Sequence, residues 1–177
     1  MKKILSAVTF TLLIAGAASA QSETASVTRK EAREEKKEIR KSEVSYQSKQ
    51  QFMKDFSSVK NPQWRVTNYF EEATFNNNGV VTTAYYDTDS QLVGTTEPKQ
   101  FSDLPASAQK YINEHYKNYK PGDVILFDDN EANETDMVLY GAPFDDEDNY
   151  FVPLTNNKET IIVKVRMNGE VSYFKKL

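Results

Sequence analysis

The sequence predicts an α+β fold: two tandem units, each a helix followed by antiparallel strands, that form one antiparallel sheet with the helices on one face. A helix pattern precedes a run of strand patterns twice, in residues 46–98 and again in residues 99–177. Within each run the strands follow one another directly, whereas strict alternation of strands and helices would predict a parallel sheet. Each unit alone hides too little surface to offset the entropy lost on ordering, so a shared sheet is expected.

The first twenty residues have the three parts of an export signal. Lys2 and Lys3 precede an apolar run over residues 4–17, and the small residues Ala-Ser-Ala follow at 18–20. The apolar run is too short to span a bilayer, and no stop-transfer pattern follows it. We therefore interpret residues 1–20 as a cleaved signal peptide and predict a periplasmic or secreted protein without stable membrane insertion. An uncleaved membrane anchor is the alternative.

Residues 21–45 differ in composition from the rest of the chain. The segment TRKEAREEKKEIRKSE carries seven basic and five acidic side chains, and only Ala32 and Ile39 are apolar. A helix without an apolar stripe has nothing to bury, so the segment is predicted to be a charged helical or disordered tether. A basic docking arm is the alternative, which the interleaved glutamates disfavour.

The first unit, residues 46–98, is predicted to begin with a helix and to continue as three strands. Phe52 and Phe56 are four residues apart and share a helix face, and Asn61-Pro62 ends the helix. The segments WRVTNYF, ATF and VVTTAYY have the alternation or β-branched content of strands, and NNNG is a hairpin turn between the last two. The segment YYDTDSQLVG then turns the chain again.

The second unit, residues 99–177, repeats this order with longer loops. Asp103 is predicted to cap a helix that has Pro105 in its first turn. The strands that follow are DVILF, TDMVLY, NYFVPL and the hairpin ETIIVKVRMNGEVSYFKKL, which turns at Asn168-Gly169. One face of the predicted helix carries Leu104, Ala108, Tyr111, Ile112 and His115.

The composition disfavours several classes of function. With Lys2 and Lys3 removed, 20 basic side chains remain against 26 acidic ones, a formal charge of −6, which disfavours nucleic acid or an anionic membrane as partner. Cysteine is absent and His115 is the only histidine, placed beside Tyr111 at the expected core margin. No GxSxG, GxGxxG or phosphate-loop motif occurs, so the chain is predicted not to be an enzyme. Paired carboxylates of the glycosidase type stay open, because their separation is not visible in a sequence.

Acidic clusters raise the question of calcium. A calcium loop counted from Asp87 requires glycine at its sixth position and glutamate at its twelfth, where Leu92 and Pro98 stand. The cluster DTDS is therefore predicted to form a turn in which carboxylates accept backbone N–H groups. Two further clusters, FDDNEANETD and FDDEDNYF, keep a weak Ca²⁺ site open as the alternative to solvated loops, which we favour. Its candidate ligands are Asp128, Asp145 and Asp146, with Asp129, Glu131, Asp136 and Asp148 nearby in the sequence.

Three segments resemble a known family. The segments AYYDTDSQLVGTT, FSDLPASAQKYINEHY and IIVKVRMNGEVSYFKKL are similar to the PepSY-like, β-lactamase-inhibitor-like proteins exported by Bacteroidetes, over residues 46–177. In that family a helix begun by Leu-Pro precedes strands that end in a hairpin with a glycine turn. The resemblance implies the same fold and, from the inhibitor in the family's name, a concave sheet that grips another protein. The matching motifs are structural, so no contact residue carries over.

The strand IIVKVRM suggests a binding surface. Its alternation sends Ile161, Val163 and Val165 to one face of the sheet. If the helices cover that face, Ile162, Lys164 and Arg166 lie on an open one, which we expect Tyr86, Tyr140 and Tyr173 to join. Tyrosine with Lys and Arg is typical of protein-binding surfaces, although a solvated face with scattered aromatics has a similar composition.

The leading hypothesis is therefore an exported, non-enzymatic protein-binding module, inhibitor-like in the sense of the resemblance. Its partner would be an envelope or extracellular protein, and it would need no cofactor. The alternative is a small-ligand or calcium-responsive envelope module that uses the acidic loops.

Overall fold

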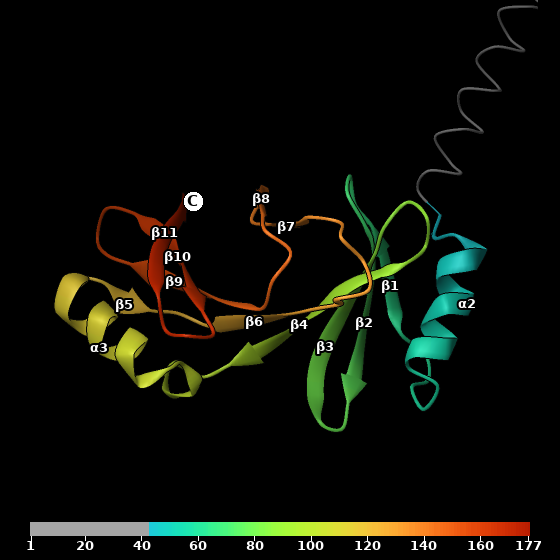
Figure 1. Ribbon diagram of the computed structural model, residues 1–177, viewed down its shortest axis with the longest axis horizontal. Coiled ribbons are helices and arrows are strands. Elements are labelled where there is room, and N and C mark those ends of the chain that lie inside the picture. Colours follow the sequence, from blue (N-terminus) through green and yellow to red (C-terminus); the bar gives the residue numbers. More distant parts are fainter. Residues whose placement is uncertain (1–42) are drawn as a thin grey trace, which may run out of the picture. The chain divides into compact units, whose positions relative to one another are not determined.

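The computed structural model describes residues 43–177, and the predicted signal peptide and almost all of the predicted tether lie outside the described residues (Figure 1). Within the described range no helix is both long and apolar enough to cross a membrane. The chain forms helix α2 (Tyr46–Asp55) and then strands β1 (Gln63–Val66), β2 (Glu71–Asn77), β3 (Val80–Tyr86) and β4 (Leu92–Lys99).

Local sequence explains how these first elements begin and turn. The Ser45 hydroxyl caps α2 by accepting a hydrogen bond from the Ser48 backbone N–H at 3.0 Å. Asn78 and Gly79 turn β2 into β3 with φ angles of 52° and 94°, the positive values that a tight hairpin turn needs.

The second run of elements starts with the 3-10 turn η1 (Phe101–Asp103) and helix α3 (Ala106–His115). It continues with strands β5 (Lys120–Pro121), β6 (Val124–Asp129), β7 (Met137–Leu139), β8 (Ala142–Phe144), β9 (Asn149–Thr155), β10 (Thr160–Arg166) and β11 (Val171–Lys176). The predicted helix cap is wrong, because Asp103 instead accepts a hydrogen bond from the Gln100 backbone N–H at 2.7 Å and closes η1. Helix α3 starts after Pro105, which has no side-chain hydrogen bond to offer.

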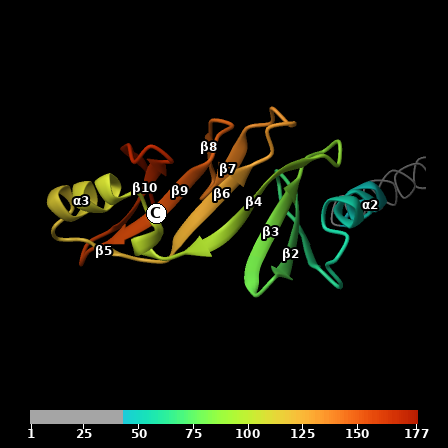
Figure 2. The same ribbon diagram turned by 60° about the horizontal axis from the view of Figure 1, so that its bottom comes forward.

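One antiparallel sheet of nine strands joins the two runs. Its order is β1-β2-β3-β4-β6-β9-β10-β11, and β5 pairs with the end of β9. The junction is the pairing of β4 with β6, from Gly94 opposite Asp129 to Lys99 opposite Val124. Figure 2 shows these strands side by side across the sheet. The predicted α+β fold is confirmed.

Both helices cover the same face of the sheet. Helix α2 inserts Phe52 against Ala84 and Tyr86 of β3, while α3 inserts Ile112 against Val163 of β10. The strand registers from β3 through β4, β6 and β9 to β10 place these strand residues on one face, which we call the helix face.

The predicted place of His115 at the core margin of α3 is wrong. His115 is exposed, and its ring stacks on that of Tyr111 with the ring centroids 4.0 Å apart. Tyr116, the next residue, packs against the core under α3.

The opposite face of the sheet is partly covered, contrary to the prediction of an open face. Strands β7 and β8 pair only with each other and form a separate hairpin, drawn above β6 in Figure 1. Met137 and Phe144 of this hairpin are buried in one cluster with Phe127, Phe151 and Ile162 of the main sheet. We call this the hairpin face, because the chain's own hairpin packs on it.

Candidate functional site

Tyr86 does not lie on an open surface, so its predicted place is wrong. Alternation along β3 sends Tyr85 to the hairpin face and Tyr86 to the helix face, where it is fully buried beside α2. The Tyr86 hydroxyl donates a hydrogen bond to Asp55 Oδ2 of α2 at 3.0 Å. Burial and the neighbouring Asp55 carboxylate raise the pKa of Tyr86 far above its usual value. Tyr86 therefore holds α2 to the sheet.

Tyr173 and Tyr140 lie on different parts of the molecule. Tyr173 is 60% exposed, but it pairs with Val163 and so lies on the helix face, because β11 contains a bulge opposite Ile162 and Val163. Tyr140 lies at the turn between β7 and β8 with a φ of 52°, and its backbone carbonyl accepts a hydrogen bond from Lys175 Nζ at 2.7 Å. The tyrosines therefore do not form one surface.

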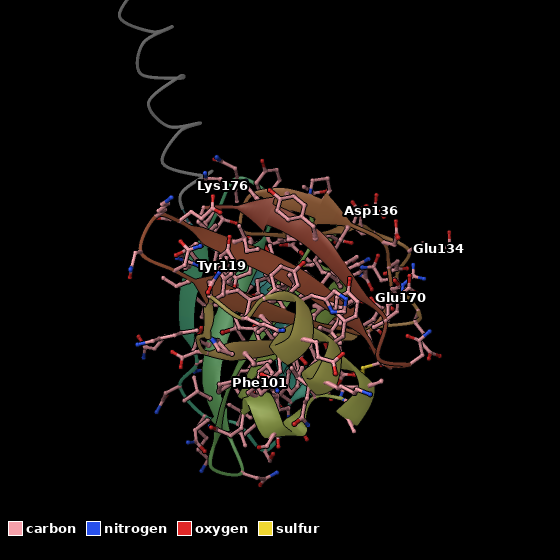
Figure 3. All side chains as sticks on the ribbon, turned by 90° about the vertical axis from the view of Figure 1, so that its left-hand side faces the viewer. Phe101, Tyr119, Glu134, Asp136, Glu170 and Lys176 are labelled. Atoms are coloured by element: carbon pink, nitrogen blue, oxygen red, sulfur yellow. The ribbon has the colours of Figure 1, made fainter. Side chains whose placement is uncertain are left out.

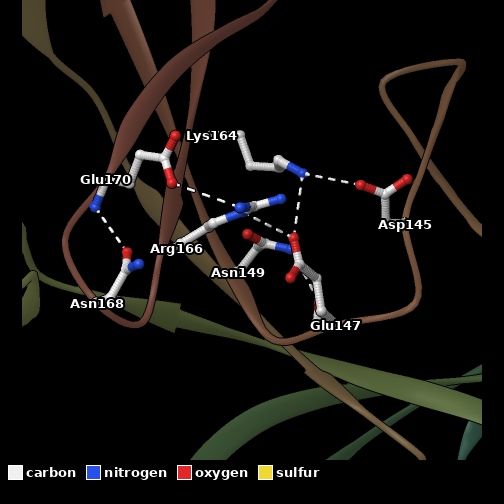
Figure 4. A network of polar contacts seen from close by, with 7 residues as sticks. All are labelled: Asp145, Glu147, Asn149, Lys164, Arg166, Asn168 and Glu170. Atoms are coloured by element: carbon white, nitrogen blue, oxygen red, sulfur yellow. Dashed lines mark hydrogen bonds and ion pairs between the residues drawn. The ribbon is translucent and has the colours of Figure 1, made fainter.

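Lys164 and Arg166 lie on the hairpin face as predicted, but acidic side chains pair with both (Figure 4). The Lys164 side chain is only 12% exposed, and its Nζ lies 3.9 Å from Asp145 and 3.5 Å from Glu147. Arg166 Nε lies 3.0 Å from Glu147 Oε1, and its Nη1 lies 3.4 Å from Glu170. These ion pairs neutralise the charge that was expected to attract a partner.

The segment DTDS forms a turn, as predicted. Asp87 Oδ1 accepts hydrogen bonds from the backbone N–H groups of Asp89 and Gln91, both at 2.9 Å. Its other oxygen accepts a hydrogen bond from Asn133 Nδ2 at 2.9 Å. Asp87 thus pins the β3–β4 turn to the loop that precedes β7.

The three candidate calcium ligands do not converge. Asp128 pairs with Thr95 and points to the helix face, whereas Asp145 is exposed beside Lys164 and Asp146 lies beside Asp129. Figure 3 shows Glu134 and Asp136 extending outward from the loop before β7, as expected of residues that solvate a loop. Over residues 43–177, no group of three or more His, Cys, Asp or Glu side chains is placed to hold a metal ion.

An acidic pocket lies at the end of β6. It has a volume of about 420 Å³ and is lined mainly by Asp129, Asp146, Asp148, Glu131, Glu147 and Arg166. Burial raises the pKa of Asp129 to about 7, and the hydrogen bond with Asp146 and the charges of Asp146 and Asp148 act in the same direction. Alternation in VILFDD, which puts Phe127 and Asp129 on one face, was the sequence signal for this carboxylate.

A larger groove lies between α2 and the segment that leads into β1, and we call it the α2 groove. It has a volume of about 520 Å³, and its lining is Tyr46, Lys49, Gln50, Phe52, Met53, Val59, Lys60, Asn61, Pro62 and Trp64. Its floor is aromatic, with the rings of Phe52 and Trp64 in edge contact at 5.6 Å. The sequence pattern did not predict this groove, because Met53 lies just beside the predicted apolar face of the helix.

Apolar side chains at the α2 groove are accessible to solvent. Tyr46 is 70% exposed and Met53 is 53% exposed. Lys49 and Lys60 also line the groove, and neither forms an ion pair with another residue in the described part of the chain. The groove thus combines an apolar floor with two cationic groups that have no described counter-ion.

Solved structures from Bacteroides species share this fold. A DUF2874 family protein from Bacteroides uniformis matches with a TM-score of 0.61 at 12% identity, over 75% of this chain and 90% of that one. A BLIP-like protein from Bacteroides fragilis matches with a TM-score of 0.58 at 14% identity, over 76% and 87%. A protein from Bacteroides eggerthii, whose provisional name places it in the periplasm, matches with a TM-score of 0.60 at 12% identity, over 75% and 89%.

At these identities the likeness shows the fold alone. It confirms the inhibitor-like fold that the sequence motifs indicate, while the names of these structures say nothing of the PepSY part of the resemblance. No protein-family model matches the sequence, and no curated protein matches it significantly.

Proposed function

We propose that this chain is an exported, non-enzymatic module that binds another protein, and that the α2 groove is its docking surface. The observation that carries the proposal is the exposure of Tyr46 and Met53 above an aromatic floor. Isolated apolar residues on a surface are ordinary, but aromatic and Met side chains gathered at one hollow mark an interface. The name of the periplasmic structural neighbour supports the exported location.

The charges of the groove indicate what kind of partner fits. Lys49 and Lys60 are the charged residues of the lining, and both are positive. The chain as a whole carries a net negative charge, whereas this site is positive. The site therefore favours the approach and binding of a negatively charged segment of the partner. We infer that the partner presents an apolar side chain flanked by carboxylates.

The acidic pocket is a weaker basis for function, because its arrangement does not suit catalysis. The Oδ1 atoms of Asp129 and Asp146 are both fully buried, so a substrate cannot reach them. Neither of these two atoms has a hydrogen-bond partner among the described residues. This geometry favours a structural use of the pair.

Reversing the two groove charges is expected to abolish binding while the fold stays intact. A variant with Lys49→Glu and Lys60→Glu should retain at most about one tenth of the wild-type partner, since like charges across an interface oppose association. Both side chains are exposed, so the melting temperature should stay unchanged. The measurement is quantitative mass spectrometry of proteins captured from the envelope fraction by the mature chain.

A matched control carries Lys117→Glu and Lys158→Glu, two exposed lysines remote in sequence from α2. Its net charge equals that of the groove variant, so a general charge effect would weaken both variants alike. Partners of the groove are those kept by the control and lost by the groove variant. Equal capture by the wild type and both variants would refute the groove as the docking surface.

A further inference from the structure

Three buried acceptor atoms belong to the end of β6 and to the residues around the start of β9. They are Asp129 Oδ1, Asp146 Oδ1 and Asn149 Oδ1, and none has a hydrogen-bond partner among the described residues. Asn149 is fully buried, and its Nδ2 donates to the Glu147 backbone carbonyl at 2.9 Å. A buried oxygen without a hydrogen-bond donor is unfavourable, so this site calls for a donor.

Two of these atoms belong to carboxyl groups that line the same pocket. Asp129 ends β6 and Asp146 belongs to residues 145–148, which we call the acidic loop. An ionised carboxylate only accepts hydrogen bonds, so two of them cannot bond to each other unless one carries a proton. We propose that Asp129 and Asp146 share one proton, and that this proton holds the acidic loop against the end of β6.

The charges around the pair do not offer another donor. Asp148 lies near it and already accepts the Asp129 backbone N–H at 2.8 Å. Glu131 and Glu147 complete an acidic lining. Arg166 is the one cation in the lining, and Glu147 and Glu170 engage its guanidinium. Burial and these negative charges raise the pKa of Asp129 to about 7.

The shared proton acts on the acidic loop, and the two residues beside Asp146 in this loop, Asp145 and Glu147, form ion pairs on the hairpin face. Glu147 is held by Lys164 and Arg166 (Figure 4), and Asp145 lies beside Lys164. Loss of the proton leaves two negative charges in contact, which repel and drive the loop away from β6. The acidic loop is therefore held against the end of β6 below about pH 7 and released from it above that pH.

The sign of the pH dependence follows from the direction of the shift. Asp129 titrates near 3.8 when unperturbed and near 7 in the folded protein, so the folded state binds the proton more tightly. The stability that the pair contributes is fully present below about pH 4 and is lost as pH rises through about 7. Carboxylates in ordinary ion pairs contribute stability that is lost as pH falls. The loss of stability with rising pH therefore distinguishes this pair from them.

The test is a carbon-detected NMR titration of the aspartate side chains in the full mature protein. We expect one titration step of the pair near pH 7 and a second far lower, as for two groups sharing a proton. In Asp146→Asn, an amide replaces the shared proton as donor, so the upper step should disappear and Asp129 should titrate at least one pH unit lower. Asp136→Asn, at an exposed acidic residue, should leave both steps in place.

A second measurement keeps the proposal testable if a variant folds poorly. Hydrogen exchange of the amides of residues 145–149, corrected for intrinsic base catalysis, should speed up above pH 7 in the wild type. It should become independent of pH in Asp129→Asn. An absence of any aspartate titrating above about pH 5.5 would overturn the proposal. So would saturable calorimetric heat with millimolar Ca²⁺ that vanishes in Asp129→Asn, because a cation would then satisfy these oxygens.

Discussion

Replacing Phe151 with alanine is expected to lower the free energy of unfolding by about 3–5 kcal/mol, the range for a buried Phe→Ala change. Phe151 is fully buried in the middle of β9, and its ring centroid lies 4.7 Å from that of Phe144 and 5.0 Å from that of Phe174. Its removal leaves a cavity between the main sheet and the β7–β8 hairpin. Urea unfolding followed by circular dichroism measures the change.

The control is Tyr173→Ala, which removes an aromatic ring of similar size from the neighbouring hairpin. Tyr173 is 60% exposed, so its loss should change the free energy of unfolding by no more than about 0.5 kcal/mol. If Phe151→Ala also fell within about 1 kcal/mol of the wild type, the hairpin would not be packed on the sheet. The hairpin face would then be open, as the sequence first suggested.

Much of the fold could be predicted because most elements carry a local signal. The β10 pattern placed Val163 on the helix face and Ile162 opposite it, and the structure confirms both. The turns at Asn78-Gly79 and Gly169 were readable because positive φ favours Gly and Asn there. These signals depend on a residue and its near neighbours, so no knowledge of distant contacts was needed.

Only one strand of the hairpin that packs on the sheet face had such a signal, since TDMVLY predicted β7 but nothing predicted β8. Strand β8 has three residues, Ala142–Phe144, too few to show alternation. Its turn at Tyr140-Gly141 has positive φ at both residues, but a Tyr there is uncommon. That Met137 and Phe144 pack on Phe151 depends on contacts distant in sequence, which a pattern of neighbours does not contain.

The predicted binding surface was wrong because the sequence did not show to which face of the sheet each tyrosine points. A bulge shifts the register of β11, and one residue of shift moves a side chain to the other face. Tyr173 therefore lies on the helix face, although its exposure was expected. The pairing of Asp129 with Asp146 could not be predicted from the sequence either, because it joins a strand end to a loop that follows the β7–β8 hairpin.

These corrections change where a partner can bind. A concave sheet that grips a protein requires an accessible sheet face, and here the β7–β8 hairpin covers Phe127, Phe151 and Ile162 of that face while the acidic loop pairs with Lys164 and Arg166. The helix face is partly covered by α2 and α3. Among the described residues the α2 groove is an accessible, concave apolar surface, and for this reason the proposed docking surface lies there.

Replacing Gly94 with alanine is expected to destabilise the junction between the two runs of strands by about 1–3 kcal/mol, the usual effect of overpacking a filled core. Gly94 lies in β4 opposite Asp129 of β6. A Cβ atom there would lie 2.6 Å from the backbone oxygen of Asp128 and 2.6 Å from the ring of Phe127. The ring can turn, but the backbone oxygen can move only if β6 moves away from β4.

Comparing Gly94→Ala with Gly122→Ala in urea unfolding isolates this effect. A Cβ at Gly122 would have its nearest neighbour, Pro153 Cβ, at 3.4 Å, an ordinary contact, so that variant should stay within about 0.5 kcal/mol of the wild type. Adding Phe127→Leu to Gly94→Ala removes the ring clash and leaves the clash with the Asp128 oxygen. The two changes should therefore couple favourably without full rescue of Gly94→Ala. Full additivity would show that the Phe127 ring does not lie over Gly94, and the packing of the β4–β6 junction would need revision.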